Sequence, residues 1–178
     1  MQIIKMMLIT LILSCFMIPC SALPPFQVLR SCMDLKPYDN KSKTLRLDGG
    51  GYADKSIEGC EEQYDREIND HMYGTLMCNQ KFYFIINDKK IDPELADNQS
   101  INPEIKPGVE FTTRSLWYKI DYEDKEYICI YAPLAEQGVG ASRVQYYLIE
   151  NAFDKKLTPQ LTYYFFDKNI APITSKTL

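Results

Sequence analysis

Residues 116–122 decide the fold, and they read Leu-Trp-Tyr-Lys-Ile-Asp-Tyr. The apolar residues at the even positions alternate with Lys119 and Asp121, and Trp117 is the exception on the polar side. Alternation with a period of two is typical of a strand that buries one face. The sequence therefore predicts a half-buried β-strand over 116–122.

Further apolar segments surround this strand. Residues 127–131 are apolar on both faces, which favours a central strand, and residues 123–126 form a charged loop of hairpin length. Residues 143–150 alternate again, and residues 161–166 follow after a turn. Residues 81–88 predict an earlier, buried strand. Because short connections favour neighbouring antiparallel partners, these segments predict an antiparallel sheet of about five strands.

One amphipathic helix is predicted between Ser56 and about Met77. Ser56 is a suitable N-cap, and Glu58 and Glu61 lie in the first turns, where the helix dipole favours negative charge. Apolar residues recur at spacings of three and four, so that they share one face. The apolar stripe consists of Ile57, Cys60, Tyr64, Ile68 and Met72. The predicted fold class is α+β, with this helix packed on the sheet.

The segment before the helix is rich in turn residues. Residues 23–52 contain several prolines and the run Gly49-Gly50-Gly51, which predicts a loop-rich segment with one short strand over 44–47. The glycine run lacks the ending of a phosphate-binding loop, so it is interpreted as a turn.

The first 22 residues resemble a targeting segment. Lys5 precedes an apolar run, and Ser21-Ala22 provides the small residues that signal peptidase requires. Residues 1–22 are therefore predicted to be a cleaved signal peptide, and residues 23–178 a single exported domain without a transmembrane span. Cys15 leaves open a lipid-anchored envelope component as an alternative.

The charge of the chain is moderately acidic. The formal net charge is −4, and the sequence has no cluster of lysine and arginine. A nucleic-acid partner is therefore not expected, because such a protein carries a basic patch.

Four cysteines follow the predicted signal peptide. An even number in an exported chain predicts two disulfides, and three pairings of Cys32, Cys60, Cys78 and Cys129 are open. The preferred pairing joins Cys32 to Cys60 and Cys78 to Cys129. No cysteine or histidine spacing indicates a metal site, and no cofactor is expected.

Enzyme motifs are not evident. His71 is the only histidine, and it is expected near the end of the predicted helix with a surface or capping role. The sequence has neither HExxH nor GxSxG, so no catalytic residue is assigned. A secreted hydrolase that cleaves cell-wall or host polymers with two carboxylates stays an alternative, because the two acids can be far apart in sequence.

The loop 132–142 is the first candidate for a contact site, because binding residues concentrate on loops held by a rigid sheet. The predicted function is a periplasmic or secreted protein-binding domain, with an inhibitor or immunity protein that neutralises an enzyme in the same compartment as its specific form. The candidate contact residues are Leu134, Gln137, Gly138, Val139, Gly140 and Arg143, with Tyr118 and Tyr147 from the neighbouring strands.

Overall fold

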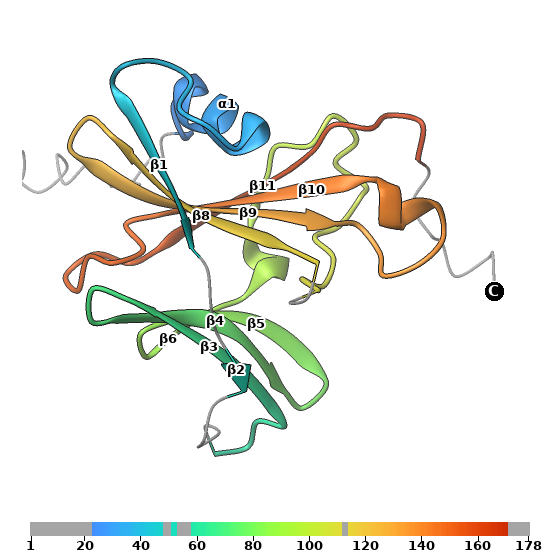
Figure 1. Cartoon of the computed structure of the whole chain (residues 1–178). Helices are drawn as coiled ribbons and strands as arrows, with labels where there is room; N and C mark the ends of the chain where they lie inside the picture. Colours follow the sequence, from blue (N-terminus) through green and yellow to red (C-terminus); the bar gives the residue numbers. More distant parts are fainter. Residues whose placement is uncertain (1–22, 48–50, 53–57, 112–113, 171–178) are drawn as a thin grey trace, which may run out of the picture.

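The described part of the chain has three layers, formed by one α-helix and two sheets (Figure 1). The structure, a computed structural model, describes residues 23–47, 51–52, 58–111 and 114–170. The predicted signal peptide and Cys15 lie outside the described residues, as do Ser56 and Ile57. Helix α1 covers one face of sheet A, and sheet B packs on the other face.

Sheet A has six strands in the order β1-β8-β9-β10-β11-β7, all antiparallel neighbours except the parallel pair β11 and β7. These strands are β1 (Ser42–Leu47), β7 (Asp97–Asn98), β8 (Leu116–Tyr122), β9 (Lys125–Pro133), β10 (Val144–Glu150) and β11 (Gln160–Phe165). The four predicted strands between residues 116 and 166 are confirmed, and they are consecutive neighbours.

Sheet B has five strands in chain order, β2-β3-β4-β5-β6. They are β2 (Gly51–Tyr52), β3 (Glu62–Ile68), β4 (His71–Cys78), β5 (Lys81–Ile86) and β6 (Lys89–Ile91). The prediction of one sheet with about five strands is therefore wrong in its count of sheets. The whole of sheet B lies in the chain between β1 and β8, which are themselves neighbours in sheet A.

The helix predicted from Ser56 to Met77 is wrong, because the described part of this segment forms the hairpin β3–β4. Asn69 and Asp70, which join the two strands, have φ angles of 47° and 63°. Positive φ at both central residues defines the type I′ turn, whose twist matches that of paired strands. Asn79 and Gln80 join β4 to β5 in the same way, with φ angles of 51° and 62°.

The helix of the fold lies instead at Phe26–Asp34 (α1), within the segment predicted to be loop-rich. Pro25 is the N-cap residue, and it suits this place because it lacks the N–H that would have no acceptor within the helix. Val28, Ser31 and Cys32 are buried, at spacings of three and one. They face sheet A, so tertiary packing holds this short helix in place.

Both faces of sheet A are buried, which explains why Trp117 interrupts the polar side of its strand. Trp117 is 1% exposed and packs in the core between the two sheets, where its ring centroid lies 5.6 Å from Tyr73 and 5.8 Å from Phe84. Ile120 and Tyr122 point to the opposite face and pack under α1. The strand thus contributes to two cores.

The described residues form two disulfides, and their pairing differs from the preferred one. Cys32 of α1 is bonded to Cys129 of β9, and Cys60 is bonded to Cys78 at the end of β4. The preferred pairing depended on the helix at 56–77. Because this helix does not exist, Cys60 lies beside Cys78 on the outer face of sheet B.

Candidate partner-binding surface

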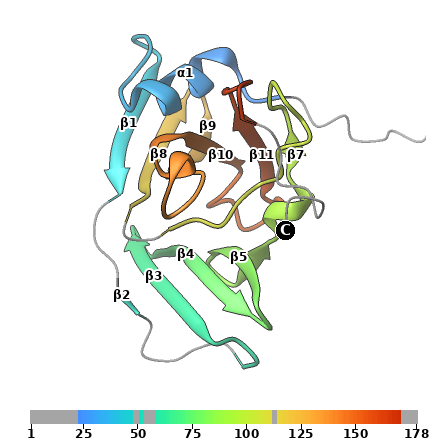
Figure 2. The ribbon, with the colours of Figure 1, turned by 90° about the vertical axis from the view of Figure 1, so that its right-hand side faces the viewer.

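The loop between β9 and β10 has a defined backbone and lies at one end of sheet A (Figure 1). Leu134 N donates to Arg143 O at 2.8 Å, and Ala135 N donates to Gly140 O at 3.3 Å. Residues Val139–Ser142 form a 3₁₀ turn, η2, which lies in front of the strands in Figure 2. The side chain of Val139 is 70% exposed. The loop therefore presents an apolar residue to solvent on a fixed backbone.

Two glycines permit this loop conformation. Gly138 has a φ of 71°, in the left-handed region that glycine adopts without strain. A Cβ atom on Gly140 would lie 2.7 Å from the Cβ of Ala135, so only glycine allows the two arms of the loop to approach this closely.

Two arginines brace the loop from outside. The Arg114 Nη1 donates to Glu136 O at 2.5 Å, and the Arg143 Nη1 lies 2.8 Å from the Asp167 carboxylate. The side chain of Arg143 is 45% exposed, whereas that of Asp167 is 16% exposed. Each arginine therefore supports the loop and keeps part of its guanidinium open to solvent.

Aromatic side chains line the face of sheet A beside the loop. Tyr131 on β9 and Tyr146 on β10 are directly opposite each other in the register, with ring centroids 5.5 Å apart. Phe166, just after β11, lies 5.8 Å from Tyr146. All three are partly exposed. We call Tyr131, Tyr146 and Phe166 the aromatic strip.

Two hollows lie along the aromatic strip. One has a volume of 460 Å³ and is bordered by Arg143, Tyr146 and Phe166, and the other has a volume of 590 Å³ and is bordered by Arg114 and Tyr131. Both are also lined by Ser142 and Val144, so they adjoin each other across the base of the loop. The loop, the aromatic strip and the two hollows form one continuous surface.

The hydroxyl of Tyr146 is neutral on this surface at neutral pH. Burial raises the pKa of Tyr146, and the neighbouring Tyr131 and Asp34 raise it further, while Arg30 opposes them. A neutral phenol both donates and accepts a hydrogen bond and keeps an apolar ring, which is the combination that favours tyrosine in protein interfaces.

The structure places the predicted contact residues unequally. Val139, Gln137 and Gly138 are exposed, and Leu134 and Gly140 are partly buried at the base of the loop. Tyr118 shares the helix-side face of sheet A and packs against the core under α1. These residues occupy the loop and the adjoining face of the sheet. Tyr147 does not, because it is buried in the core between the sheets.

The expectation that Tyr147 lies exposed beside the loop is wrong. Tyr147 is 0% exposed and points into the core between the sheets. Its hydroxyl donates to Gly108 O at 2.5 Å and lies 2.9 Å from the Oε1 of Gln145, which in turn accepts from Gly108 N at 3.0 Å. The Nε2 of Gln145 donates to Pro133 O at 2.9 Å. This network ties the chain around Gly108 to the base of the loop.

We expect the variant Tyr147→Phe to lower the free energy of unfolding by about 1–2 kcal/mol, because a buried network loses its donor to Gly108 O. Urea unfolding monitored by circular dichroism measures this change. Tyr38→Phe is the control, since Tyr38 is 48% exposed and should tolerate loss of its hydroxyl. Equal stability of the two variants would contradict a structural role for the Tyr147 hydroxyl.

His71 is placed differently from its prediction as well. It begins β4 rather than ending a helix, and its ring lies against Phe153 with centroids 4.8 Å apart. Its Nδ1 is 3.4 Å from the Nδ2 of Asn87. Within the described ranges, no group of three or more histidine, cysteine or acidic residues could hold a metal ion.

Sequence reasoning did not single out Arg114 or the aromatic strip. Tyr131 and Tyr146 were assigned to strands without a register, so their contact could not be seen. Closing the segment 132–145 as a hairpin would have paired them, because the register Tyr146↔Tyr131 follows from the pair Val144↔Pro133. That pairing is the signal that could have located the strip.

No protein-family model, curated protein or solved structure matches this chain.

Proposed function

We propose that the protein is an exported protein-binding domain, and that it contacts its partner with the β9–β10 loop and the aromatic strip. The observation that carries the proposal is the continuity of the exposed loop, the partly exposed aromatic side chains and the two hollows. Aromatic residues and arginine are enriched at protein interfaces and among the residues that dominate the binding energy. Aromatic side chains bury a large area with little loss of conformational freedom, and arginine supplies several hydrogen-bond donors.

The form of the surface favours a protein partner whose contacting segment is apolar and acidic. Val139 and the aromatic strip supply the apolar contacts, and Arg114, Arg143 and Lys168 lie at the borders of the hollows. Asp167 is already paired with Arg143. A loop with a fixed backbone loses little entropy on binding, so it suits insertion into a cleft. An inhibitor or immunity protein that blocks an enzyme is the specific form of this proposal.

The proposed location is the periplasm or the outside of the cell. Two disulfides are compatible with either compartment, because both are oxidising. Among the residues described by the structure, no helix is both long and apolar enough to cross a membrane.

We expect Val139→Asp to weaken partner binding at least about tenfold, which corresponds to about 1.4 kcal/mol. The substitution places a charge in the apolar contact, and at a position that is 70% exposed it should leave stability within about 0.5 kcal/mol. Leu95→Asp is the matched control, because Leu95 is 82% exposed and lies outside the proposed surface, in the 3₁₀ turn η1 (Pro93–Leu95).

The experiment immobilises the oxidised protein and both variants, and offers each the envelope and secreted fractions of the source organism. Quantitative mass spectrometry then compares the retained proteins. A protein retained by the original chain and by Leu95→Asp, and lost with Val139→Asp, supports the proposal, and an activity assay of that protein tests inhibition. If no retained protein distinguishes the two variants, the proposed surface is wrong.

A further inference from the structure

The two disulfides lie in different surroundings. Cys32 and Cys129 are both 0% exposed, between α1 and sheet A. Cys78 is 7% exposed and Cys60 is partly exposed, on the outer face of sheet B. A thiol in solution can therefore approach Cys60 in the folded protein, whereas the first disulfide is closed to it.

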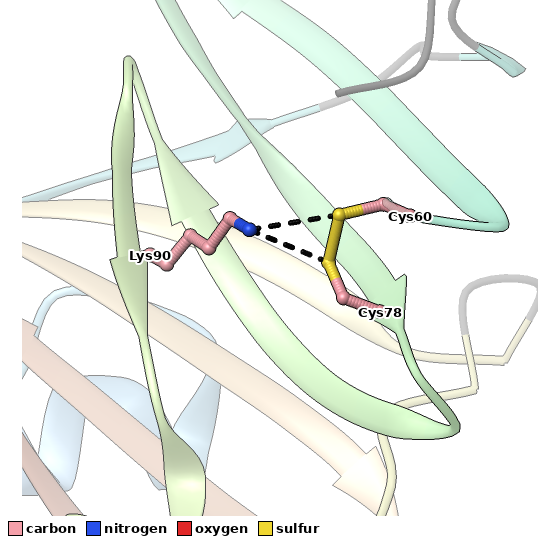
Figure 3. The surroundings of a disulfide bond; sticks show 3 residues. All are labelled: Cys60, Cys78 and Lys90. Carbon is pink, nitrogen blue, oxygen red and sulfur yellow. Dashed lines mark hydrogen bonds between the residues drawn. A yellow bond between two sulfur atoms is a disulfide. The ribbon is translucent and has the colours of Figure 1, made fainter. Parts of the chain in front are cut away.

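A lysine side chain lies over the disulfide between Cys60 and Cys78. The Nζ of Lys90, from β6, is 3.6 Å from the Sγ of Cys60 and 3.5 Å from the Sγ of Cys78, as Figure 3 shows. Its other contact is with the ring of Tyr83, whose centroid is 5.9 Å away. Within the described ranges no carboxylate forms an ion pair with Lys90, so its ammonium group is directed to the two sulfur atoms.

The position of Lys90 matters because the surroundings of Cys78 are apolar. Leu76 and Ile85 pack beside Cys78, and they are 1% and 0% exposed. A thiolate is unfavourable among apolar side chains, and a nearby cation stabilises it. Lys90 thus supplies the charge that a thiolate at Cys78 requires.

We propose that the Cys60–Cys78 disulfide is a thiol–disulfide exchange site that reacts with a dithiol reductant while the protein stays folded. Lys90 stabilises the sulfur that leaves. No comparable arrangement surrounds the disulfide of Cys32 and Cys129, among the contacts of the described residues.

The exchange transfers two electrons from the dithiol to the disulfide in two steps. A thiolate of the dithiol attacks the Sγ of Cys60, the S–S bond breaks, and its electron pair moves to the Sγ of Cys78. The second thiol of the reductant, as a thiolate, then attacks the mixed disulfide at the reductant's own sulfur and releases Cys60. The protein gains two electrons and two protons, and the dithiol is oxidised to a disulfide.

Opening this disulfide leaves the sheet intact. The closed loop spans a sequence separation of 18, and the strands β3 and β4 within it are also joined by the paired register from Glu62↔Met77 to Ile68↔His71. The exchange is therefore a local event on the outer face of sheet B.

The test treats the oxidised protein with dithiothreitol under native conditions, stops the reaction with acid, alkylates the free thiols and maps them by mass spectrometry. We expect Cys60 and Cys78 to be alkylated at least about tenfold faster than Cys32 and Cys129, because buried disulfides react only after unfolding. The buried disulfide reports unfolding in the same sample. If both pairs open together, the proposal is wrong.

The variant Lys90→Met tests the role of the cation. We expect reduction to slow about threefold, because loss of the cation raises the pKa of the leaving thiol and a thiol of higher pKa leaves more slowly. Lys90→Arg should restore the rate, and Lys155→Met, at an exposed lysine of another loop, should not change it.

A second readout separates charge from structure. In the reduced protein, the pH midpoint for alkylation of Cys78 should rise in Lys90→Met and stay unchanged in Lys155→Met. If Lys90 has only a structural role, its substitution should leave the pH midpoint for alkylation of Cys78 unchanged. If the rate and the midpoint of Lys90→Met both equal those of the original chain, the cation has no part in the exchange and the proposal is overturned.

Discussion

The protein is expected to unfold steeply as the pH rises from about 10 to about 12, because several of its tyrosines are buried as neutral phenols. Burial, with the nearby Glu150, raises the pKa of Tyr127 to about 12, and burial with Asp97 raises that of Tyr164 to about 12. Burial also raises the pKa of Tyr147 and of Tyr163. These four side chains are at most 6% exposed.

The direction of this pH dependence follows from the difference in tyrosine pKa between the folded and the unfolded state. The unfolded chain ionises its tyrosines near pH 10, while the folded protein holds them neutral, so the stabilisation is complete below pH 10 and is lost as the pH approaches the folded pKa values. Each such tyrosine contributes a slope of about 1.4 kcal/mol per pH unit. Four of them give about 5 kcal/mol per unit, against a total stability of about 5–15 kcal/mol. Circular dichroism and tyrosinate absorbance should therefore change together.

Tyr127→Phe provides the sharpest control for this transition. The Tyr127 hydroxyl is buried and has no hydrogen-bond partner in the described structure, so its removal should not destabilise the protein at neutral pH. Unfolding of this variant at alkaline pH should release about one proton fewer, so its stability should fall less steeply with pH. Tyr38→Phe, at a half-exposed position, should leave the transition unchanged. Tyrosinate absorbance that rises well before the loss of structure would contradict the burial argument.

Removal of the disulfide between Cys32 and Cys129 is expected to lower the free energy of unfolding by about 4 kcal/mol, because it closes a loop with a sequence separation of 97. For a chain of this size, such a loss lowers the melting temperature by about 8–16 °C. The measurement is thermal and urea unfolding of the double variant Cys32→Ala, Cys129→Ala.

The matched control is the double variant Cys60→Ala, Cys78→Ala, whose disulfide has a separation of 18. Loop-closure entropy makes the expected loss about 1.5 kcal/mol smaller for this variant. The first disulfide also anchors α1, since Val28 and Cys32 pack on the same core as Cys129. A larger loss in the control variant would show that chain entropy does not determine the ranking.

The strands from 116 to 166 could be predicted because two of them alternate, the other two are short apolar runs rich in aromatic residues, and turn residues separate all four. The hairpin β3–β4 could not be recognised in this way. Its apolar residues Tyr64, Ile68 and Met72 satisfy helical spacing equally well, and the decisive signal was the dipeptide Asn69-Asp70, which accepts positive φ at both positions. The turn at Asn69 and Asp70, rather than the spacing of the apolar residues, therefore identifies this segment as a hairpin.

The helix α1 could not be recognised because the prolines around its start indicate a loop equally well. Prolines at positions 24 and 25 are typical of a loop, but Pro25 is compatible with a helix that begins at the next residue, because it lacks the N–H that would have no acceptor there. The preferred disulfide pairing depended on both errors. It joined Cys60, in the predicted helix, to Cys32, in a segment predicted to be a loop, whereas Cys32 lies on the real helix and is bonded to Cys129. The loop predicted at 132–142 does connect two strands, but residues 132 and 133 belong to β9 and the connection runs from 134 to 143. The burial of Tyr147 depends on the second sheet, which no local pattern predicts.

The insertion of sheet B between β1 and β8 has a consequence for the folding pathway. Strands β8 to β11 are consecutive and pair through short loops, so their contacts close quickly with little loss of chain entropy. Strand β1 has to pair across the whole inserted sheet, as in the contact between Leu47 and Trp117. We therefore expect the four-strand meander to form the folding nucleus, and the edge of sheet A at β1 to assemble last.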